Sequence, residues 1–467
     1  MSALRRAQLQ VDSRRVRTAL ERICTAIGDA GGRAFVVGGA VRDAVLGLRS
    51  TDLDVEVYGI EPGDLERLLA RHFAVDLVGK SFGVIKLKGL PIDVALPRRE
   101  SKAGLGHRAF DVLSDPRMPL EEAQSRRDFT MNAMALDPLT SEVIDTFGGL
   151  EDIGAHVLRH TSDKFGEDPL RVLRGMQFAA RFELEVAPET IELCRTIEPE
   201  GLPAERLFEE WRKLVLKGRK PSLGLSFLRA CGWVRHFPEL EALIGCEQDP
   251  AKHPEGNVWN HTLACMDAFA AERIGNEWED LVVGFAVLCH DLGKPATSAR
   301  DDDGRIRSHG HEAAGEAPTL TFLGRLTTHR DLVEQVVSLV VVHDAPLHLH
   351  TAQAGASAIR RLARRVGRID RLNRVARADH AGRTLPPTAD FPAAEWLLER
   401  ARELNVERTP PRPIVMGRHL VEMGLAPGPR FGRVLRACFE AQIAGDFETL
   451  ERGLELAREI LAKDPEH

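Results

Sequence analysis

The segment from residue 35 to residue 56, FVVGGAVRDAVLGLRSTDLDVE, constrains the fold more than any other part of the chain. Phe35–Val37 is apolar and rich in valine, which predicts a buried strand, and the pair Gly38-Gly39 ends it. Helical spacing follows from residue 40 to residue 48, so the glycines stand at a helix N-terminus. Free backbone N–H groups and the positive end of the helix dipole make such a corner a place for phosphate.

An acidic strand comes directly afterwards. Asp52, Asp54 and Glu56 alternate with apolar residues, so a period of two puts the carboxylates on one face of the strand. Adjacent carboxylates repel each other unless a cation lies between them, and oxygen ligands of this kind suit Mg²⁺. A phosphate-binding turn beside a magnesium site provides the two basic requirements for transferring a nucleotidyl group. Either motif alone has an ordinary structural explanation, a turn or a solvated strand face, but the combination favours function.

Two further segments carry arginine next to acid. In SRRDFTMNAMALD, residues 125–137, Arg127 and Asp128 either start a helix or face a nucleotide, and we favour the second interpretation. In GEDPLRVLRGMQFAARF, residues 166–182, Pro169 fits the first helical position with Asp168 as its cap. Four side chains then lie along one face of that helix, namely Arg171, Arg174, Phe178 and Arg181. Because the three arginines repel one another, this face needs an anionic or planar group against it.

Together these motifs resemble the tRNA nucleotidyltransferase and bacterial poly(A) polymerase family, whose head has a DNA polymerase β-like fold. The resemblance implies that Asp52 and Asp54 are catalytic and hold two Mg²⁺ ions. It also implies that Glu167, Asp168 and Arg171 act as a protein template that reads the base. The nucleotide-binding residues implied by the resemblance are Gly38, Gly39, Arg42, Arg127, Asp128, Glu167, Asp168, Arg171 and Arg174.

A second group of metal-binding residue types begins after residue 226. Several histidines and His-Asp pairs recur there, and imidazole mixed with carboxylate suits zinc, manganese, iron or nickel. This part resembles the HD phosphohydrolase domain. The implied metal ligands are His261, His290, Asp291, His311, His343 and Asp379. Lys294 would neutralise a phosphate, and metal binding is a firmer expectation than hydrolysis because some relatives keep this fold without activity.

The expected fold class is α+β. The resemblance implies a nucleotidyltransferase head with a mixed sheet (1–160), an all-helical neck with the base-recognition motif (161–225), an HD-type helical domain (226–390) and a helical tail (391–467). A length of 467 residues is too long for one core. The charged N-terminus has no apolar segment like that of a signal peptide, and the apolar runs are too short for a membrane span, which indicates a cytoplasmic protein.

The net charge of −7 means that any nucleic acid must be bound by local patches. Residues 360–383 carry nine arginines and two aspartates, and contact with a tRNA backbone and a solvated face remain equal alternatives there. Asp93, inside an apolar strand, is either a third acid near the metals or the partner of Arg98 or Arg99. Residues 97–125 are expected to be a long functional loop.

The expected function is template-independent addition of C, C and A to tRNA 3′ ends from CTP and ATP, with release of pyrophosphate. The first alternative is a poly(A) polymerase, which the segment LVGKSFGVIKL at residues 77–87 disfavours because it is more similar to CCA-adding members. A passive head beside a working hydrolase and an enzyme that adds only CC or only A are further alternatives. The sequence is compatible with a monomer or a homodimer.

Overall fold

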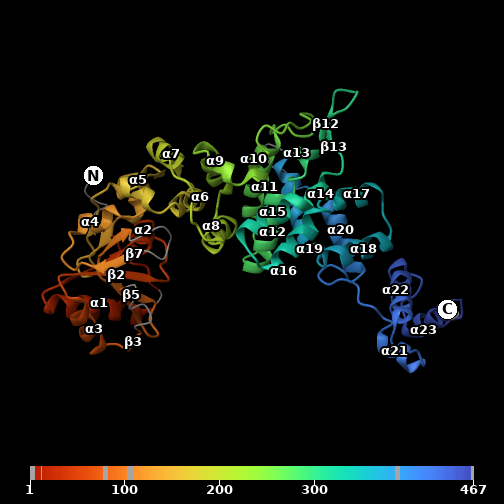
Figure 1. Cartoon of the computed structure of the whole chain (residues 1–467), viewed down its shortest axis with the longest axis horizontal. Helices are drawn as coiled ribbons and strands as arrows, with labels where there is room; N and C mark the ends of the chain where they lie inside the picture. The colour runs from red at the N-terminus through yellow and green to blue at the C-terminus, as the bar shows by residue number, and fades with distance from the viewer. Residues whose placement is uncertain (1–5, 12, 77–82, 103–109, 384–389, 464–467) are drawn as a thin grey trace. The chain divides into compact units, whose positions relative to one another are not determined.

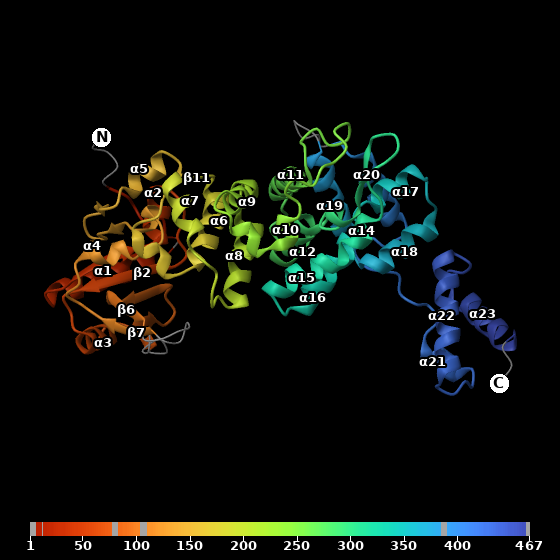
Figure 2. The same cartoon turned by 45° about the horizontal axis from the view of Figure 1, so that its top comes forward.

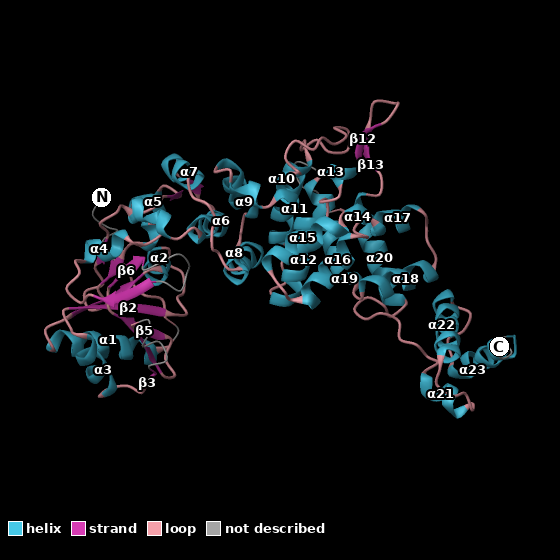
Figure 3. Cartoon of the chain, viewed as in Figure 1, coloured by secondary structure: helices cyan, strands magenta, loops and turns pink. Residues whose placement is uncertain are grey.

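The computed structural model describes residues 6–11, 13–76, 83–102, 110–383 and 390–463. The chain divides into two compact units, Met1–His236 and Phe237–His467. Strands gather in the first unit, and the second is helical apart from one small hairpin (Figure 3). This organisation confirms the predicted α+β class with a helical C-terminal region.

The head is built on a seven-stranded mixed sheet, in which β2 and β5 are parallel and the other neighbours are antiparallel. In spatial order its strands are β3 (Val75–Asp76), β4 (Val84–Leu87), β5 (Ile92–Ala95), β2 (Leu53–Tyr58), β1 (Arg33–Val37), β8 (Ala135–Leu136) and β9 (Val143–Ile144). Helices α1 (Arg14–Asp29) and α3 (Pro62–Ala70) lie on one side of this sheet (Figure 1). Residues of α2 (Gly39–Val45) and α5 (Gly149–Gly154) pack into the same core cluster, whereas α4 (Leu120–Ser125) packs against Phe35 and Val37 on the opposite face.

The register of the central strands separates the core face from the acidic face. Leu53, Val55 and Val57 of β2 are buried in the core with α1, which confirms the predicted alternation. Antiparallel pairing places Asp54 opposite Val37 of β1, and parallel pairing places it beside Asp93 of β5. The acids therefore lie on the sheet face away from α1, next to the loop that joins β1 to α2.

The predicted loop at residues 97–125 is wrong in part. Strands β6 (Arg98–Lys102) and β7 (Phe110–Ser114) pair antiparallel and lie side by side in Figure 2, and α4 occupies the end of the segment. A partner strand satisfies the backbone hydrogen bonds of a polar segment, so the lack of apolar periodicity did not exclude strands. Residues 77–82, most of the segment predicted to favour CCA addition, and the interval 103–109 lie outside the described residues.

The neck continues the first unit through β10 (Val157–Leu158), η3 (Asp163–Glu167), α6 (Leu170–Phe182), β11 (Glu185–Val186), α7 (Pro188–Arg195), α8 (Ala204–Lys217), α9 (Pro221–Ala230) and η4 (Trp233–His236). Helix α6 packs against both α8 and α9. A Cβ atom at Gly224 would lie 2.3 Å from the carbonyl oxygen of Met176, so glycine is required where α9 crosses α6. Pro169 precedes the first helical residue rather than occupying it, a difference of one position.

The second unit begins with α10 (Pro238–Glu241), and its core bundle contains α11 (Val258–Ala271), α12 (Glu277–Cys289), α16 (Arg330–Val340) and α19 (Ile369–Gly382). Around the bundle lie α13 (Lys294–Thr297), β12 (Ser298–Arg300), β13 (Ile306–Ser308), α14 (His311–Ala314), α15 (Glu316–Leu326), α17 (Ala345–Thr351), α18 (Ala356–Val366) and α20 (Pro392–Glu403). Helix α20, which the predicted boundary at 390/391 assigns to the tail, packs against α17 and α19. The tail helices α21 (Gly417–Glu422), α22 (Pro429–Ala444) and α23 (Leu450–Lys463) share a separate apolar cluster.

The arginine-rich segment at residues 360–383 is largely engaged inside the second unit. Arg371 and Arg374 of α19 bind Glu279 and Asp280 at the start of α12. Arg368 also binds Glu279, Arg377 binds Glu272, and Arg383 binds Asp379. Internal ion pairs between helices thus account for most of this charge, an explanation that neither alternative from the sequence included.

Within the described residues, one helical segment, Arg330–Thr351, has the length and composition of a membrane span. A single segment of this kind is weak evidence, because core helices of globular domains have the same composition.

Candidate functional sites

The acidic face of the head brings three aspartates to adjacent positions. Asp52 precedes β2, Asp54 lies within it, and Asp93 is the neighbour of Asp54 on β5. Burial raises the pKa of Asp54, and the charges of Asp93 and Asp52 raise it further, as expected where carboxylates crowd together. The partner of Asp93 is Lys86 of β4, whose Nζ lies 2.7 Å from Oδ2. This set of oxygen donors fits a divalent cation of the magnesium type.

A glycine corner faces these acids. Gly38 has φ of +73°, a backbone conformation that favours glycine, and a Cβ atom there would lie 2.8 Å from Nη1 at the flexible end of the Arg127 side chain. The Nη2 atom of Arg127 is 3.8 Å from Oε1 of Glu56, and its charge lowers the pKa of Asp54. Arg127 therefore lies between the corner and the acidic strand, as expected of a contact to an anionic nucleotide.

Arg42 lies beside the glycine corner and contacts the residues around it. Its guanidinium is 4% exposed, donates to Asp43 at 2.6 Å and to Asn132 at 2.8 Å, and lies over the ring of Phe182. Asn132 in turn donates to Asp128 at 3.0 Å. These contacts make Arg42 a positioning residue, and its contact with a triphosphate stays a prediction.

The ion pair between Asp128 and Arg174 joins the head to α6. Arg174 Nη2 lies 2.6 Å from Asp128 Oδ2, and Phe129 N–H also donates to this carboxylate. The ring of Phe178 lies under both Arg174, at 5.2 Å, and Arg42, at 5.4 Å. An anion and aromatic rings thus offset the charge on the arginine-bearing face of α6, as the sequence required.

The predicted base-reading residues lie at the entry to α6. Asp168 Oδ1 accepts the Leu170 N–H at 3.0 Å, the expected capping contact, while Oδ2 binds Arg206 of α8 at 2.8 Å. Glu167 binds Arg126 at 3.1 Å. Arg171 donates to the carbonyl oxygens of Lys164 and Arg126, at 2.8 and 2.6 Å. The structure therefore brings all three residues together, each with a polar partner from the protein.

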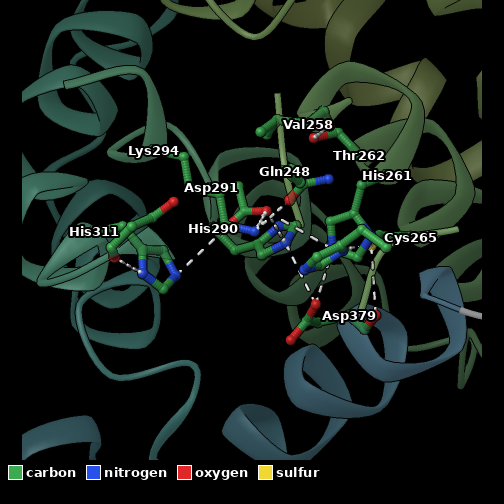
Figure 4. A network of polar contacts seen from close by, with 12 residues as sticks. Gln248, Val258, His261, Thr262, Cys265, His290, Asp291, Lys294, His311 and Asp379 are labelled. Carbon is green, nitrogen blue, oxygen red and sulfur yellow. Dashed lines mark hydrogen bonds and ion pairs between the residues drawn. The ribbon is translucent and has the colours of Figure 1, made fainter. Parts of the chain in front are cut away.

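The helical unit gathers the predicted HD residues into one buried cluster (Figure 4). His261 comes from α11, Asp379 from α19, and His290 from the C-terminal end of α12. His261 Nε2 lies 2.9 Å from Asp379 Oδ1, and His290 Nε2 lies 3.8 Å from the same atom. Burial lowers the pKa of His290, but the adjacent Asp291 carboxylate raises it to about 10.

Four imidazoles in this cluster each have Nδ1 beside an oxygen acceptor. His261 Nδ1 lies 2.8 Å from Glu255 Oε1. The other three bind backbone carbonyls, namely His290 to Val287, His311 to Ser308 and His343 to Val340. Such contacts fix the tautomer that leaves Nε2 free as a metal ligand.

Asp291 lies between two groups of these imidazoles. Its Oδ2 is 3.2 Å from His290 Nε2, and its Oδ1 is 3.5 Å from His311 Nε2 and 4.0 Å from His343 Nε2. Among the described residues, His290 Nε2 and both carboxylate oxygens of Asp291 are buried without a hydrogen bond of good geometry. Buried imidazole and carboxylate donors of this kind fit transition-metal ions, which Asp291 and these imidazoles would hold.

Sequence reasoning missed several residues around both sites. Lys86 and Glu255 have no local signal, because Lys86 reaches Asp93 across the β4–β5 pair and Glu255 itself lies in an irregular segment. Arg383 lies four residues after Asp379, and Cys265 lies four residues after His261, a helical spacing that could have indicated both. Lys294, predicted to meet a phosphate, binds Asp291 Oδ2 at 2.7 Å.

The comparisons with known proteins agree with both units. Residues 34–159 match the family model described as the poly A polymerase head domain. The multifunctional CCA protein of Cupriavidus metallidurans is 37% identical over 383 residues, which cover 78% of this chain and 89% of the relative. That of Chromobacterium violaceum is 39% identical over 319 residues, covering 67% and 74%.

Solved structures share the fold. The Bacillus stearothermophilus CCA-adding enzyme in complex with CTP aligns with a TM-score of 0.66 at 23% identity, covering 97% of this chain and 99% of that one. The Thermotoga maritima CCA-adding enzyme complexed with tRNA-CCA aligns with a TM-score of 0.59 at 20% identity, covering 97% and 96%. The identity to curated relatives over most of their length, together with the fold and the acidic site, shows that this chain belongs to the family of multifunctional CCA proteins.

Proposed function

We propose that this protein is a template-independent tRNA nucleotidyltransferase that adds CCA to tRNA 3′ ends from CTP and ATP and releases pyrophosphate. The observation that carries this proposal is the placement of Asp52, Asp54 and Asp93 on one sheet face opposite the Gly38 corner, with Arg127 between them. The names of the relatives, which describe CCA proteins and complexes with CTP, ATP and tRNA, support the choice of substrates.

Each residue of the proposed site would have a separate role in nucleotidyl transfer. Gly38 leaves the backbone at the corner open to a triphosphate, and Arg127 adds a guanidinium that pairs with phosphate oxygens. The buried Asp128–Arg174 pair holds the segment that carries Arg127 against α6. Asp52 and Asp54 would hold Mg²⁺, which supplies charge neutralisation of the leaving group and a lower pKa of the attacking 3′-hydroxyl when bound.

Selection between CTP and ATP would fall to the entry of α6. Asp168 and Arg171 can each present donors or acceptors to a base edge after exchanging their present partners, Arg206 and two backbone carbonyls. Before such an exchange, Arg171 holds the segment of Lys164 with one terminal nitrogen and the carbonyl of Arg126 with the other. The poly(A) polymerase, CC-only and A-only alternatives would differ from CCA addition in which nucleotides are selected and in how many are added.

The decisive experiment incubates the full chain with tRNA ending before CCA, tRNA ending after CC and an unrelated RNA. Each nucleotide is supplied alone and in mixture, and product lengths are read on a gel. We expect a defined CCA addition to tRNA that Asp54→Asn abolishes and that Asp64→Asn, in an exposed ion pair on α3, leaves unchanged. Long A tracts would support the poly(A) alternative, and full activity of Asp54→Asn would contradict the proposed site.

A second activity is favoured by the cluster in the helical unit. We propose that His261, His290, Asp291 and Asp379 hold one metal ion and that Asp291, His311 and His343 hold a second. The bound ions would supply an activated water for phosphoester hydrolysis. Lys294 and Arg383, whose charges face Asp291 and Asp379, would bind the phosphate of the substrate. Three nearby residues line a cavity with them, Gln248, Lys252 and Arg307.

Metal content and hydrolysis test this second activity separately. We expect the purified chain to retain nickel, manganese or zinc and to hydrolyse a bis-aryl phosphodiester. His290→Ala should lose both properties, whereas His329→Ala, a substitution in the same unit but outside the cluster and this cavity, should lose neither. Metal retention without hydrolysis would leave a structural site. A tRNA-processing role also implies a cytoplasmic protein, and size measurements in solution would separate monomer from homodimer.

A further inference from the structure

A thiol lies inside the first of the two proposed metal sites. Cys265 stands one helical turn after His261 on α11, and its Sγ atom is 3.4 Å from His261 Nε2. The metal-binding atoms of Cys265, His261, His290 and Asp379 all lie within 4.8 Å of one another, and all four residues are buried. Figure 4 shows these side chains converging from α11, α12 and α19.

The fold makes space for this thiol. A Cβ atom at Gly382 would lie 2.4 Å from Cys265 Sγ and 3.0 Å from the Cys265 backbone nitrogen. Glycine at this position of α19 therefore allows α11 to approach closely, three residues after Asp379. A larger residue at position 382 would displace the sulfur from the cluster.

Two neighbouring residues indicate that the space beside the sulfur is a ligand position. His290 Nε2 is buried and has no hydrogen bond of good geometry within the described part of the chain. His261 Nδ1 is engaged by Glu255, so its Nε2 atom is directed toward Asp379 and Cys265. An unpartnered buried nitrogen beside a second oriented imidazole is a common arrangement around a metal ion.

We propose that Cys265 is a sulfur ligand of the His261–His290–Asp379 site. This inference rests on the proposed metal centre and adds a donor to it. With the proposed ligand Asp291, this position has two imidazoles, two carboxylates and a thiolate, and the thiolate favours softer divalent ions such as Zn²⁺, Ni²⁺ or Co²⁺ over Mg²⁺. The group formed by Asp291, His311 and His343 has no sulfur, so the two positions differ in the ions they select.

Cobalt substitution tests the inference without relying on activity. The full chain is stripped with a chelator and reloaded with Co²⁺, bound cobalt is measured, and the near-ultraviolet spectrum is recorded. A thiolate ligand gives an intense sulfur-to-cobalt charge-transfer band. We expect this band in the wild type and its loss in Cys265→Ser, with zinc affinity lowered by at least the 10–100-fold typical of an outer-shell change.

Cys289→Ala is the matched control, because Cys289 is equally buried and adjacent to His290 but lies outside the cluster. It should keep the band. Bound cobalt in the wild type without a charge-transfer band would overturn the sulfur ligand and leave the metal centre intact. Failure of the wild type to bind cobalt would overturn both, and neither result depends on how well a variant folds.

Discussion

Asp128 and Arg174 form a buried ion pair whose energy depends on pH. Burial alone would raise the pKa of Asp128, but the Arg174 guanidinium and hydrogen bonds from Asn132 and Phe129 hold it below its usual range. A carboxyl with a lowered folded-state pKa stabilises the fold above its unfolded pKa of about 3.9, and this contribution is lost as pH falls through the folded value.

We therefore expect Asp128→Asn to lower the free energy of unfolding by roughly 2–3 kcal/mol at pH 7, and by much less near pH 3. This loss of unfolding free energy is smaller than that expected for a fully buried ion pair, because a third of the Arg174 side chain is exposed. Urea unfolding at both pH values measures the difference. Asp64→Asn, which breaks an exposed pair, should change stability little at either pH. An equal loss of unfolding free energy in Asp128→Asn at both pH values would contradict this explanation.

At the same scale, the sequence predicted residues that share a local pattern and missed residues that do not. Asp52 and Asp54 follow from strand alternation, and His290-Asp291 from the end of an apolar helix. The neighbour of Asp54 is set by the parallel register with β5, and the acceptor for His261 Nδ1 lies in an irregular segment. Pairing across strands and helices depends on tertiary structure, which periodicity does not encode.

Helices α6 and α9 cross where a glycine removes a side chain. A Cβ atom at Gly224 would meet the Met176 carbonyl oxygen at 2.3 Å, a backbone atom that cannot move without shifting α6. We expect Gly224→Ala to destabilise the first unit by about 1–3 kcal/mol in thermal or urea unfolding, despite the better helix propensity of alanine.

Gly63 offers the matched control on another helix of the same unit. No heavy atom lies within 4 Å of a Cβ placed there, and its φ is not positive. Gly63→Ala should stabilise the protein by roughly 0.4–1 kcal/mol through the unfolded chain. Two substitutions with the same chemistry would thus have effects of opposite sign, and a stabilising Gly224→Ala would remove the packing argument.

Elements were predicted well where apolar periodicity was strong and poorly where charge dominated. The acidic strand β2 and helix α6 form at the positions where the sequence pattern predicted a strand and a helix. The sequence left contact with RNA and a solvated face as equal alternatives for the arginines of α19. In the structure Arg371 and Arg374 bind acids that lie more than ninety residues earlier, on α12. Opposite charges that are distant in sequence can cancel in the fold, so a local charge count overstates a binding surface.

At the scale of the whole molecule, each proposed site is complete within one compact unit. The acids, the glycine corner and the arginine contacts all belong to residues before 237, and the imidazole cluster belongs to residues after it. No described ligand of one site is supplied by the other unit. The two chemistries should therefore respond independently to substitution, since effects of sites that share no residues or partners are additive.

We expect His290→Ala to lose metal from the helical unit while keeping CCA addition within about twofold of the wild type, because the two sites share no residues and their mutational effects should add. Conversely, Asp54→Asn should abolish CCA addition and leave nickel, manganese or zinc content unchanged, because its carboxylate lies outside the imidazole cluster. Elemental analysis and the tRNA extension assay on both variants and their double variant measure this directly. A double variant that behaves otherwise than the sum of its parts, or a loss of tRNA extension in His290→Ala, would mean that the two units act on one another during catalysis.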